Sequence, residues 1–379
     1  MNHRACGAFV AILALSACGG GGGGVNSASS CSFVTTGPCT TPPPDPGSST
    51  PAPVPLFEGD AAATYTAVGG AQKLVESYFE PDGGGQPAHG GELYTAGQLP
   101  LASKTVAISY DPRNAVFSVE FNVEDIDVTP RFQDPAHRTD FGPNLTPQGG
   151  VPDLPQLAYL ESGSATATSV DVQTFFYETP GTKTRYVTLA GYVRNFRDGA
   201  LDSDFKLDRT RGAGIFGNLS RVSDVPKTGS ATYAGNMLAS LVSIDLDPDP
   251  SLRSRFEWVN GTASTAVNFG TGTVTTSFQG TVVPTASAFE GAAFGTMSPA
   301  NSGATFSAAG SAKFDATGTG YAGKVDSASF AGSGITIAAS SMDGAFFGPG
   351  AVETGGAFRV IGATPDQRVD FIGAFTGVK

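Results

Sequence analysis

Hydrophobic and polar residues alternate most clearly near the C-terminal end of the chain. In the segment GAFRVI, Phe358 and Val360 alternate with less hydrophobic residues, which is the two-residue period of a half-buried strand. Glycine and proline interrupt the pattern at Gly348-Pro349-Gly350 and again around Pro365. The pattern therefore predicts three antiparallel strands: Ser341–Phe347, Gly356–Ile361 and Val369–Phe375.

Similar alternation recurs upstream, again between glycine-rich turns. It predicts five more strands: Thr228–Asn236, Ala263–Phe269, Thr273–Phe278, Thr305–Phe314 and Gly320–Phe330. Eight antiparallel strands in residues 226–379 favour a closed barrel, because closure leaves no strand edge unpaired. The inward positions are mainly Gly, Ala and Phe, so we expect a packed interior. The outward positions carry Thr, Ser, Lys and Asp, not the apolar band of a membrane-spanning barrel.

Residues 56–225 show a less regular pattern that still favours strands. Two hairpins are predicted, one from Thr105–Tyr110 with Ala115–Val123 and one from Val172–Tyr177 with Thr184–Val193. Ala71–Phe79 is the best candidate for a short helix. The predicted fold class is therefore all-β: a β-rich domain at 56–225, followed by an eight-stranded antiparallel β-barrel at 226–379.

Two segments of the first domain are predicted to be long loops. Pro130–Pro155 is rich in Pro, Asp and Asn, and Gly83–Gly91 is rich in glycine. Long loops on a strand scaffold tend to carry function. We place ligand contact on these two loops as a hypothesis from loop length alone, and the individual ligand-binding residues are unknown.

The first 55 residues predict an exported, lipid-anchored protein. Residues 1–17 have a short apolar run in the proportions of a signal peptide. Leu15-Ser16-Ala17-Cys18 has the form of a lipobox, which predicts cleavage before Cys18 and lipid attachment there. The alternative is an ordinary signal peptide with an incidental cysteine. Aspartate after the lipidated cysteine would favour the inner membrane, whereas Gly19 favours the outer membrane. Residues 18–55 are a Gly-, Ser- and Pro-rich tether.

Two further cysteines, Cys31 and Cys39, lie in the tether. In an exported protein they fit a small disulfide loop, with two free cysteines as the alternative. No histidine lies near them, so a metal site is not expected there.

Charge and motifs give no support for nucleic-acid binding or catalysis. The formal net charge is −12, and the sequence has no basic patch of the kind that binds nucleic acid. The acidic balance weakly favours basic partners. Gly212-Gly214-Gly217 and Gly318-Gly320-Gly323 match Gly-x-Gly-x-x-Gly, but a strand-like segment, not the required helix, follows the second match. No Gly-x-Ser-x-Gly elbow occurs, so we expect neither an enzyme nor a cofactor.

Acidic residues and histidines give no complete metal site. Asp245, Asp247 and Asp249 have the spacing of a calcium loop, but proline and phenylalanine stand where that loop needs glycine and glutamate. A solvated turn is expected, with a non-standard calcium site as the alternative. His89 and His137 are expected in separate exposed loops without a partner at metal-ligand spacing. A single axial histidine for haem stays open at either position.

A run of residues near the C-terminus resembles the closing signature of the barrel domains of bacterial transferrin-binding protein B. The matching positions are Phe347, Gly348, Pro349, Ala351, Glu353, Gly355, Gly356, Phe358, Gly373 and Phe375. The resemblance implies structural roles for Gly348, Pro349, Glu353, Gly355, Gly356 and Phe358. Among these, Glu353 is expected to cap or pair locally. It also implies that residues 56–225 correspond to the handle domain that precedes such a barrel.

The same resemblance implies a function in binding. Related surface lipoproteins capture a protein, iron-carrier or haem-type ligand and pass it to a TonB-dependent outer-membrane transporter. Transferrin-binding protein B has two handle-and-barrel lobes whereas this chain has room for one, so transferrin itself is not the expected ligand. The alternative is a structural or adhesive envelope lipoprotein without dedicated cargo.

Overall fold

The computed structural model describes residues 53–82, 85, 87–99, 106–123, 126–133, 149–246, 254–285, 301–314 and 318–379. Residues 50–379 form one compact unit. The described residues contain no α-helix, so none of them forms a helix long enough to cross a membrane. The expected signal peptide and residues 18–52 of the tether, with Cys18, Cys31 and Cys39, lie outside these ranges.

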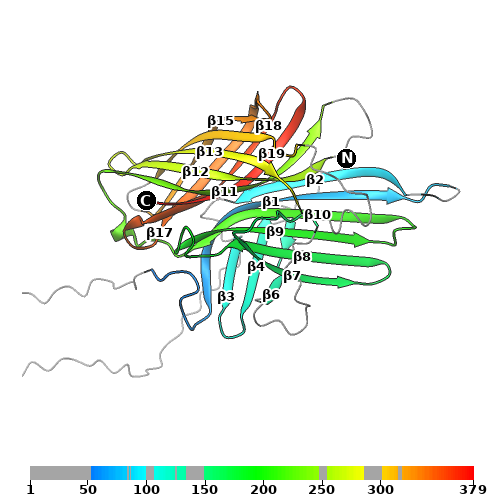
Figure 1. Ribbon diagram of the computed structural model, residues 1–379, viewed down its shortest axis with the longest axis horizontal. Coiled ribbons are helices and arrows are strands. Elements are labelled where there is room, and N and C mark those ends of the chain that lie inside the picture. The colour runs from blue at the N-terminus through cyan, green and yellow to red at the C-terminus, as the bar shows by residue number, and fades with distance from the viewer. Residues whose placement is uncertain are drawn as a thin grey trace, which may run out of the picture. The chain divides into compact units, whose positions relative to one another are not determined.

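The first sheet has ten strands, all paired antiparallel (Figure 1). They are β1 (Ala63–Phe79), β2 (Ala88–Leu99), β3 (Val106–Asp111), β4 (Val116–Val123), β5 (Ile126–Val128), β6 (Arg131–Gln133), β7 (Leu157–Ala165), β8 (Ser169–Glu178), β9 (Val187–Asp198) and β10 (Phe205–Gly217). The order is β5-β4-β3-β1-β10-β9-β8-β7, with β2 beside β1 and β6 beside β4. The two predicted hairpins are confirmed as β3–β4 and β8–β9.

The second sheet is a closed barrel. Its strands are β11 (Ser230–Asp245), β12 (Arg255–Asn268), β13 (Thr273–Val283), β14 (Thr305–Phe314), β15 (Gly320–Phe330), β16 (Ser333–Gly334), β17 (Thr336–Phe347), β18 (Glu353–Ala363) and β19 (Gln367–Val378). The order β14-β13-β12-β11-β19-β18-β17-β15 returns to β14 through the β14–β15 pairing, and the two-residue β16 flanks β15. The eight-stranded antiparallel barrel, and with it the all-β fold class, is confirmed.

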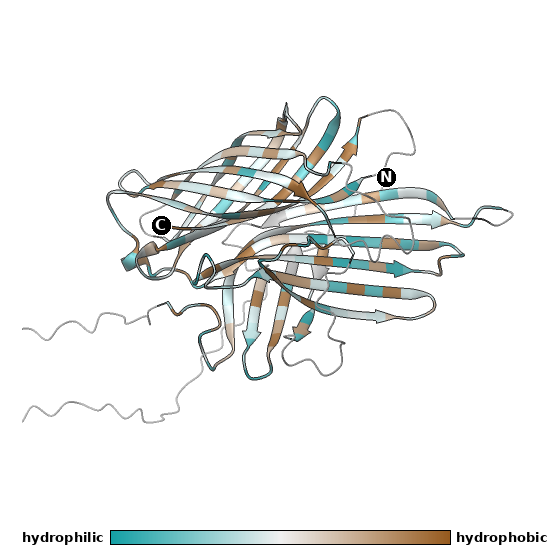
Figure 2. Ribbon diagram, in the orientation of Figure 1, coloured by the Kyte–Doolittle hydropathy of each residue, from teal (hydrophilic) through white to brown (hydrophobic). Residues whose placement is uncertain are grey.

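Aromatic rings packed against small residues fill the barrel. The rings of Phe278 and Phe358 have centroids 4.5 Å apart, and other buried phenylalanines surround them. Glycine is required beside these rings, because a Cβ on Gly373 would lie 2.3 Å from the ring of Phe358. Figure 2 shows the alternation of hydrophobic and hydrophilic residues along the barrel strands that places one set of side chains inside.

The barrel and the first sheet share a second core. It combines residues of β1, β8, β9 and β10 with residues of the barrel strands β11, β12, β17, β18 and β19. In β18 and β19 the segments 353–358 and 369–377 are therefore buried on both faces, one against the barrel interior and one against the first sheet. A strand covered on both faces has few polar positions, which explains the nearly continuous apolar run FIGAF at Phe371–Phe375.

The expected helix at Ala71–Phe79 is wrong, because this segment is the second half of β1. Every second side chain is buried, namely Gln72, Leu74, Glu76 and Tyr78. The segment contains good helix formers, but pairing with β10 on one side and β2 on the other decides its conformation.

Candidate functional site

Glu353 is the best-defined polar contact between the barrel and the first sheet. It begins β18 and is 3% exposed. Its Oε1 accepts the backbone N–H of Arg185 at 2.7 Å, and its Oε2 accepts those of Tyr186 and Val187 at 2.8 and 3.1 Å. Burial raises the pKa of Glu353, while the three N–H donors act in the opposite direction. The expected local pairing is therefore wrong: the carboxylate caps the chain as it enters β9, more than 160 residues upstream.

The neighbouring signature residues also lie against the first sheet. Gly348 has φ of 71°, and a Cβ there would lie 2.5 Å from the ring of Tyr186. A Cβ on Gly355 would lie 3.1 Å from side-chain atoms of Ile215 and Val187. Pro349 opens the 3-10 turn η3 (Pro349–Ala351) between β17 and β18. These signature positions therefore lie where the barrel contacts the first sheet.

The other signature residues pack within the barrel. A Cβ on Gly356 would lie 2.3 Å from the carbonyl oxygen of Asp343 on the neighbouring β17. Phe358 is fully buried in the barrel core.

A second polar contact joins the sheets farther along β18 and β19. Arg359 forms a bidentate pair with Asp370, with Nε–Oδ1 and Nη2–Oδ2 distances of 3.1 and 2.7 Å. Arg359 also donates to the carbonyl of Ala96 in β2, at 3.2 Å. The hydroxyl of Tyr94 donates to Oδ2 of Asp370 at 2.7 Å, and burial raises the pKa of Tyr94. Strand β2 is therefore held to the barrel by a connected set of hydrogen bonds.

Three hairpin turns of the first sheet meet at one end of it. The β1–β2, β7–β8 and β9–β10 connections are adjacent in the strand register, because Tyr78 pairs with Phe205 and Ser169 pairs with Asp198. The backbone N–H of Glu80 donates to the side chain of Asp204 at 2.9 Å. Five exposed acidic residues surround these turns and form what we call the acidic rim: Glu80, Asp82, Asp198, Asp202 and Asp204.

Large hydrophobic side chains are exposed on the β1–β2 hairpin and in the β9–β10 turn. Phe79 is 52% exposed and Leu93 is 67% exposed, and Leu201 of the β9–β10 turn is also exposed. Because side chains alternate along β1, Phe79 lies on the face opposite to Glu76 and Tyr78. Val75 lies on that same face and pairs directly with Leu93. The β1–β2 hairpin thus presents apolar side chains on the face that turns away from the barrel.

The other face of this hairpin carries a group of possible metal ligands. Glu76 pairs directly with Glu92 in the strand register, and His89 pairs with Tyr78. One ligand atom from each of Glu76, His89 and Glu92 can be chosen so that all lie within 4.8 Å of one another. The expectation of an exposed loop histidine without partners is therefore wrong for His89, which lies in β2 next to two carboxylates. His137 lies outside the described residues.

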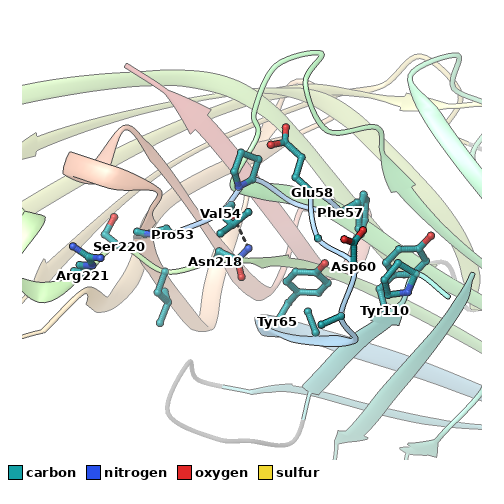
Figure 3. A pocket seen from close by; sticks show the side chains of 16 residues that line it. Pro53, Val54, Phe57, Glu58, Asp60, Tyr65, Tyr110, Asn218, Ser220 and Arg221 are labelled. Carbon is teal, nitrogen blue, oxygen red and sulfur yellow. Dashed lines mark hydrogen bonds between the residues drawn. The ribbon is translucent and has the colours of Figure 1, made fainter. Parts of the chain in front are cut away.

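A cavity of about 540 Å³ lies where the chain leads into β1 (Figure 3). The short segment 53–61 supplies much of its wall, and Tyr65 and Tyr110 line it from β1 and β3. The side-chain amide of Asn218 donates to the carbonyl of Val54 at 2.7 Å and fixes this segment beside the end of β10. Glu58, Asp60 and Arg221 give the cavity charges of both signs. It is a depression formed by the chain's own entry into the sheet.

The remaining motifs have structural places. Gly212-Gly214-Gly217 lies within β10, and Gly320 and Gly323 of the second match lie in β15, so neither match leads into a helix. Asp245 pairs with Arg255 at 2.5 Å, and this partner lowers the pKa of Asp245. Asp247 and Asp249 lie outside the described residues.

The two loops proposed for ligand contact have different outcomes. Of Pro130–Pro155, the end at 149–152 is buried, and Trp258 donates to the carbonyl of Gly150 at 2.8 Å, so this end is part of the core between the sheets. Residues 134–148 lie outside the described ranges. In Gly83–Gly91, the part from Ala88 belongs to β2.

Sequence reasoning missed the Glu76, His89 and Glu92 group because it assigned a helix to Ala71–Phe79. Lys73–Tyr78 shows no two-residue alternation of polar and apolar residues, so no local signal indicates a strand there. A strand at this position would have predicted a hairpin with Ala88–Leu99, which brings the two glutamates opposite each other.

Comparison with known proteins gives a clear result for the barrel. Residues 225–379 match the family of C-lobe and N-lobe β-barrels of transferrin-binding protein B. No curated protein gives a significant sequence match to the chain.

Solved structures with low sequence identity align over most of the chain. A double mutant of transferrin-binding protein B from Haemophilus parasuis is 12% identical, with a TM-score of 0.30, and the alignment covers 85% of this chain and 77% of that one. The haemoglobin receptor HpuA from Kingella denitrificans is 14% identical, with a TM-score of 0.26 and coverage of 87% and 90%. HpuA from the same organism in complex with human haemoglobin is 13% identical, with a TM-score of 0.28, and the alignment covers 87% of this chain and 91% of that one. Residues 225–379 are therefore similar to the β-barrel domains of transferrin-binding protein B.

Proposed function

We propose that this protein is a lipoprotein, anchored in the outer membrane and exposed at the cell surface, that binds a protein or an iron-carrier or haem-type ligand. It acts there as a co-receptor for a TonB-dependent transporter. A handle-like domain at 56–225 and the barrel at 226–379 form the binding unit, with the lipid on Cys18 and the tether at 18–55 holding it at the membrane. The observation that carries the binding role is the exposed apolar surface of the β1–β2 hairpin beside the acidic rim.

This surface has the composition of a protein-binding site. Contacts that dominate protein interfaces are apolar or aromatic side chains surrounded by polar residues that exclude water. Phe79, Leu93 and Leu201 provide exposed apolar side chains, and the acidic rim provides the charged surround. A partner that presents basic residues around an apolar centre would be attracted and oriented by these carboxylates.

Rigid support makes the surface suitable for binding. Strand β2 is hydrogen-bonded to the barrel through Tyr94 and the carbonyl of Ala96, so the barrel supports the face of the β1–β2 hairpin opposite to Phe79 and Leu93. The stacked rings of Tyr78 and Phe205, with centroids 4.6 Å apart, connect the end of β1 to β10. A preformed surface loses little side-chain entropy on binding, which favours affinity.

The test is a binding assay with the purified full-length protein against haem, human haemoglobin, transferrin and a purified TonB-dependent receptor. Haemoglobin and transferrin are included because the similar solved structures are a haemoglobin receptor and a transferrin-binding protein. We expect saturable binding of one of these ligands. Phe79→Ala should weaken that binding by about 30-fold, the effect of losing a dominant interface contact.

Val222→Ala is the matched control. Val222 is 42% exposed and lies in η2 (Val222–Asp224), away from the β1–β2 hairpin in sequence, so its removal should change affinity less than about twofold. Equal losses in both variants would contradict the hairpin as the binding surface. If folded protein binds none of the four ligands, the alternative of a structural or adhesive envelope lipoprotein is favoured. The anchor is tested separately, because Cys18→Ala should remove the protein from the membrane fraction.

A further inference from the structure

We infer that the barrel-facing side of the β1–β2 hairpin is a binding site for a divalent transition-metal ion of the Zn²⁺ type. The ligands are Nε2 of His89 and one carboxylate oxygen each from Glu76 and Glu92. One imidazole nitrogen and two carboxylate oxygens are a ligand set that Zn²⁺ accepts, and three protein ligands leave a fourth position for water. This site is independent of the proposed function, since it lies on the opposite face of the hairpin from Phe79 and Leu93.

The strand register brings the three residues together. Glu76 and Glu92 are direct partners in the antiparallel β1–β2 pair, so their side chains project from the same face. A register shift between Ser77 and Tyr78 leaves Gly90 without a partner and places His89 opposite Tyr78. This irregularity returns His89 to the face that carries both glutamates.

The charges at this position favour binding of a cation. Two carboxylates directly opposite each other in a sheet repel. Oε2 of Glu76 lies 2.5 Å from Nη2 of Arg209, so one charge is compensated and Oε1 faces His89. Glu92 accepts from the backbone N–H of Ser254 at 3.1 Å and from its hydroxyl at 2.6 Å, which are neutral donors. A cation between the glutamates compensates the charge of Glu92.

The distance between the ligand atoms favours a shared metal ion over a direct hydrogen bond. Nε2 of His89 lies 3.8 Å from Oε1 of Glu76, too far for a hydrogen bond. Nε2 is buried and has no hydrogen-bond partner among the described residues, which is costly for a polar atom. Two ligands at about 2.1 Å from a tetrahedral zinc ion lie about 3.4 Å apart, so small side-chain movements complete the site.

Hydrogen bonds to the ligands support the assignment. The hydroxyl of Tyr78 donates to Oε1 of Glu76 at 3.2 Å, and Arg209 and Ser254 hold the two carboxylates in place. Partners of this kind orient metal ligands and tune their affinity. Ser254 precedes β12 of the barrel, so a bound ion would connect the hairpin to the barrel through Glu92.

The test is a titration of the full-length protein with Zn²⁺ by calorimetry, and with Co²⁺ by visible absorption. We expect one saturable site, with Co²⁺ bands of a low-coordinate nitrogen and oxygen environment and a raised melting temperature in Zn²⁺. His89→Ala should weaken binding at least about 100-fold and abolish the melting-temperature increase, because loss of a ligand exceeds the effect of losing a supporting hydrogen bond. Glu80→Gln, on the acidic rim, is the matched control and should change affinity less than about twofold.

The outcomes separate this site from other metal-binding groups of the chain. His89→Ala retains every cysteine and His137, so binding that survives in this variant comes from elsewhere and overturns the proposal. Absence of Zn²⁺ binding at millimolar concentration in the unmodified protein also overturns it. Circular dichroism of His89→Ala should match the unmodified protein, because the side chain is 19% exposed at a strand end. If that variant is unfolded, Glu92→Gln, at an exposed residue, takes its place with the same expected loss.

Discussion

Replacing Glu353 with alanine tests whether one carboxylate holds the barrel to the first sheet. The side chain is buried and accepts three backbone N–H groups, from Arg185, Tyr186 and Val187, at 2.7 to 3.1 Å. Alanine removes the carboxylate, so the three backbone N–H groups at the start of β9 lose their acceptor. The three donors belong to consecutive residues, so they cannot all find partners within the sheet.

The expected loss of stability in Glu353→Ala follows from the backbone N–H donors that lose their acceptor. A buried N–H without a partner costs about 1–3 kcal/mol. Arg185 is exposed, so water can replace the carboxylate at its N–H, whereas Val187 is buried. Loss of the carboxylate's own desolvation cost offsets part of the penalty. We therefore expect Glu353→Ala to lower the free energy of unfolding by about 3 kcal/mol, or the melting temperature by about 4 °C.

Two measurements check this expectation. Urea unfolding of the full-length protein gives the change in stability, with Glu80→Ala as a surface control that should lie within about 0.5 kcal/mol of the unmodified protein. In hydrogen exchange, Glu353→Ala should accelerate the amides of residues 185–187 relative to the unmodified protein, and more than it accelerates the amides in the middle of β9. A loss below about 1 kcal/mol, or unchanged exchange at 185–187, would refute the reasoning.

Three further predictions concern the same barrel. Arg359→Ala should lower the free energy of unfolding by about 3–5 kcal/mol in urea unfolding, because it leaves the buried carboxylate of Asp370 without its ion-pair partner; Arg359→Lys should lose less. Burial raises the pKa of Glu353, so its carboxyl group stabilises the fold fully below about pH 4.5 and less as the pH rises through the folded pKa. In urea titrations, the free energy of unfolding of the unmodified protein should therefore exceed that of Glu353→Gln by less at about pH 8 than at about pH 5. A larger difference at about pH 8 would contradict this sign. Gly373→Ala should destabilise by about 1–3 kcal/mol in thermal unfolding, since its Cβ would lie 2.3 Å from a phenylalanine ring, whereas Gly334→Ala, with open space around it, should be nearly neutral.

The barrel could be predicted from the sequence because its information is local. Alternating residues give each strand, and glycine or proline gives each turn, as at Gly348 to Gly350. The eight predicted strands correspond to eight observed strands, although most observed strands are longer. In β11 and at the start of β18 the extra length lies where both faces of the strand are buried, because alternation disappears there.

The polar contacts could not be predicted because they depend on register and on packing between distant segments. The three donors to Glu353 are more than 160 residues away in the chain, and no local pattern indicates them. Similarly, Glu76 and Glu92 became partners only through the hairpin register, which the helix assignment at Ala71–Phe79 concealed. The buried polar residues Gln72 and Glu76 interrupt the apolar face of β1, so its pattern resembled that of an amphipathic helix.

The shared core between the two sheets has a consequence for the timing of folding. Ala357 and Ala374, from the last two strands, complete a core that begins with Val68 of β1. During synthesis, which starts at the N-terminus, this face of the first sheet therefore cannot be fully buried until β18 and β19 have been made. Contacts of such long sequence separation slow folding and leave apolar surface exposed in the meantime. Loss of β19 would accordingly open the barrel and uncover the apolar face of the first sheet that Ala374 helps to bury.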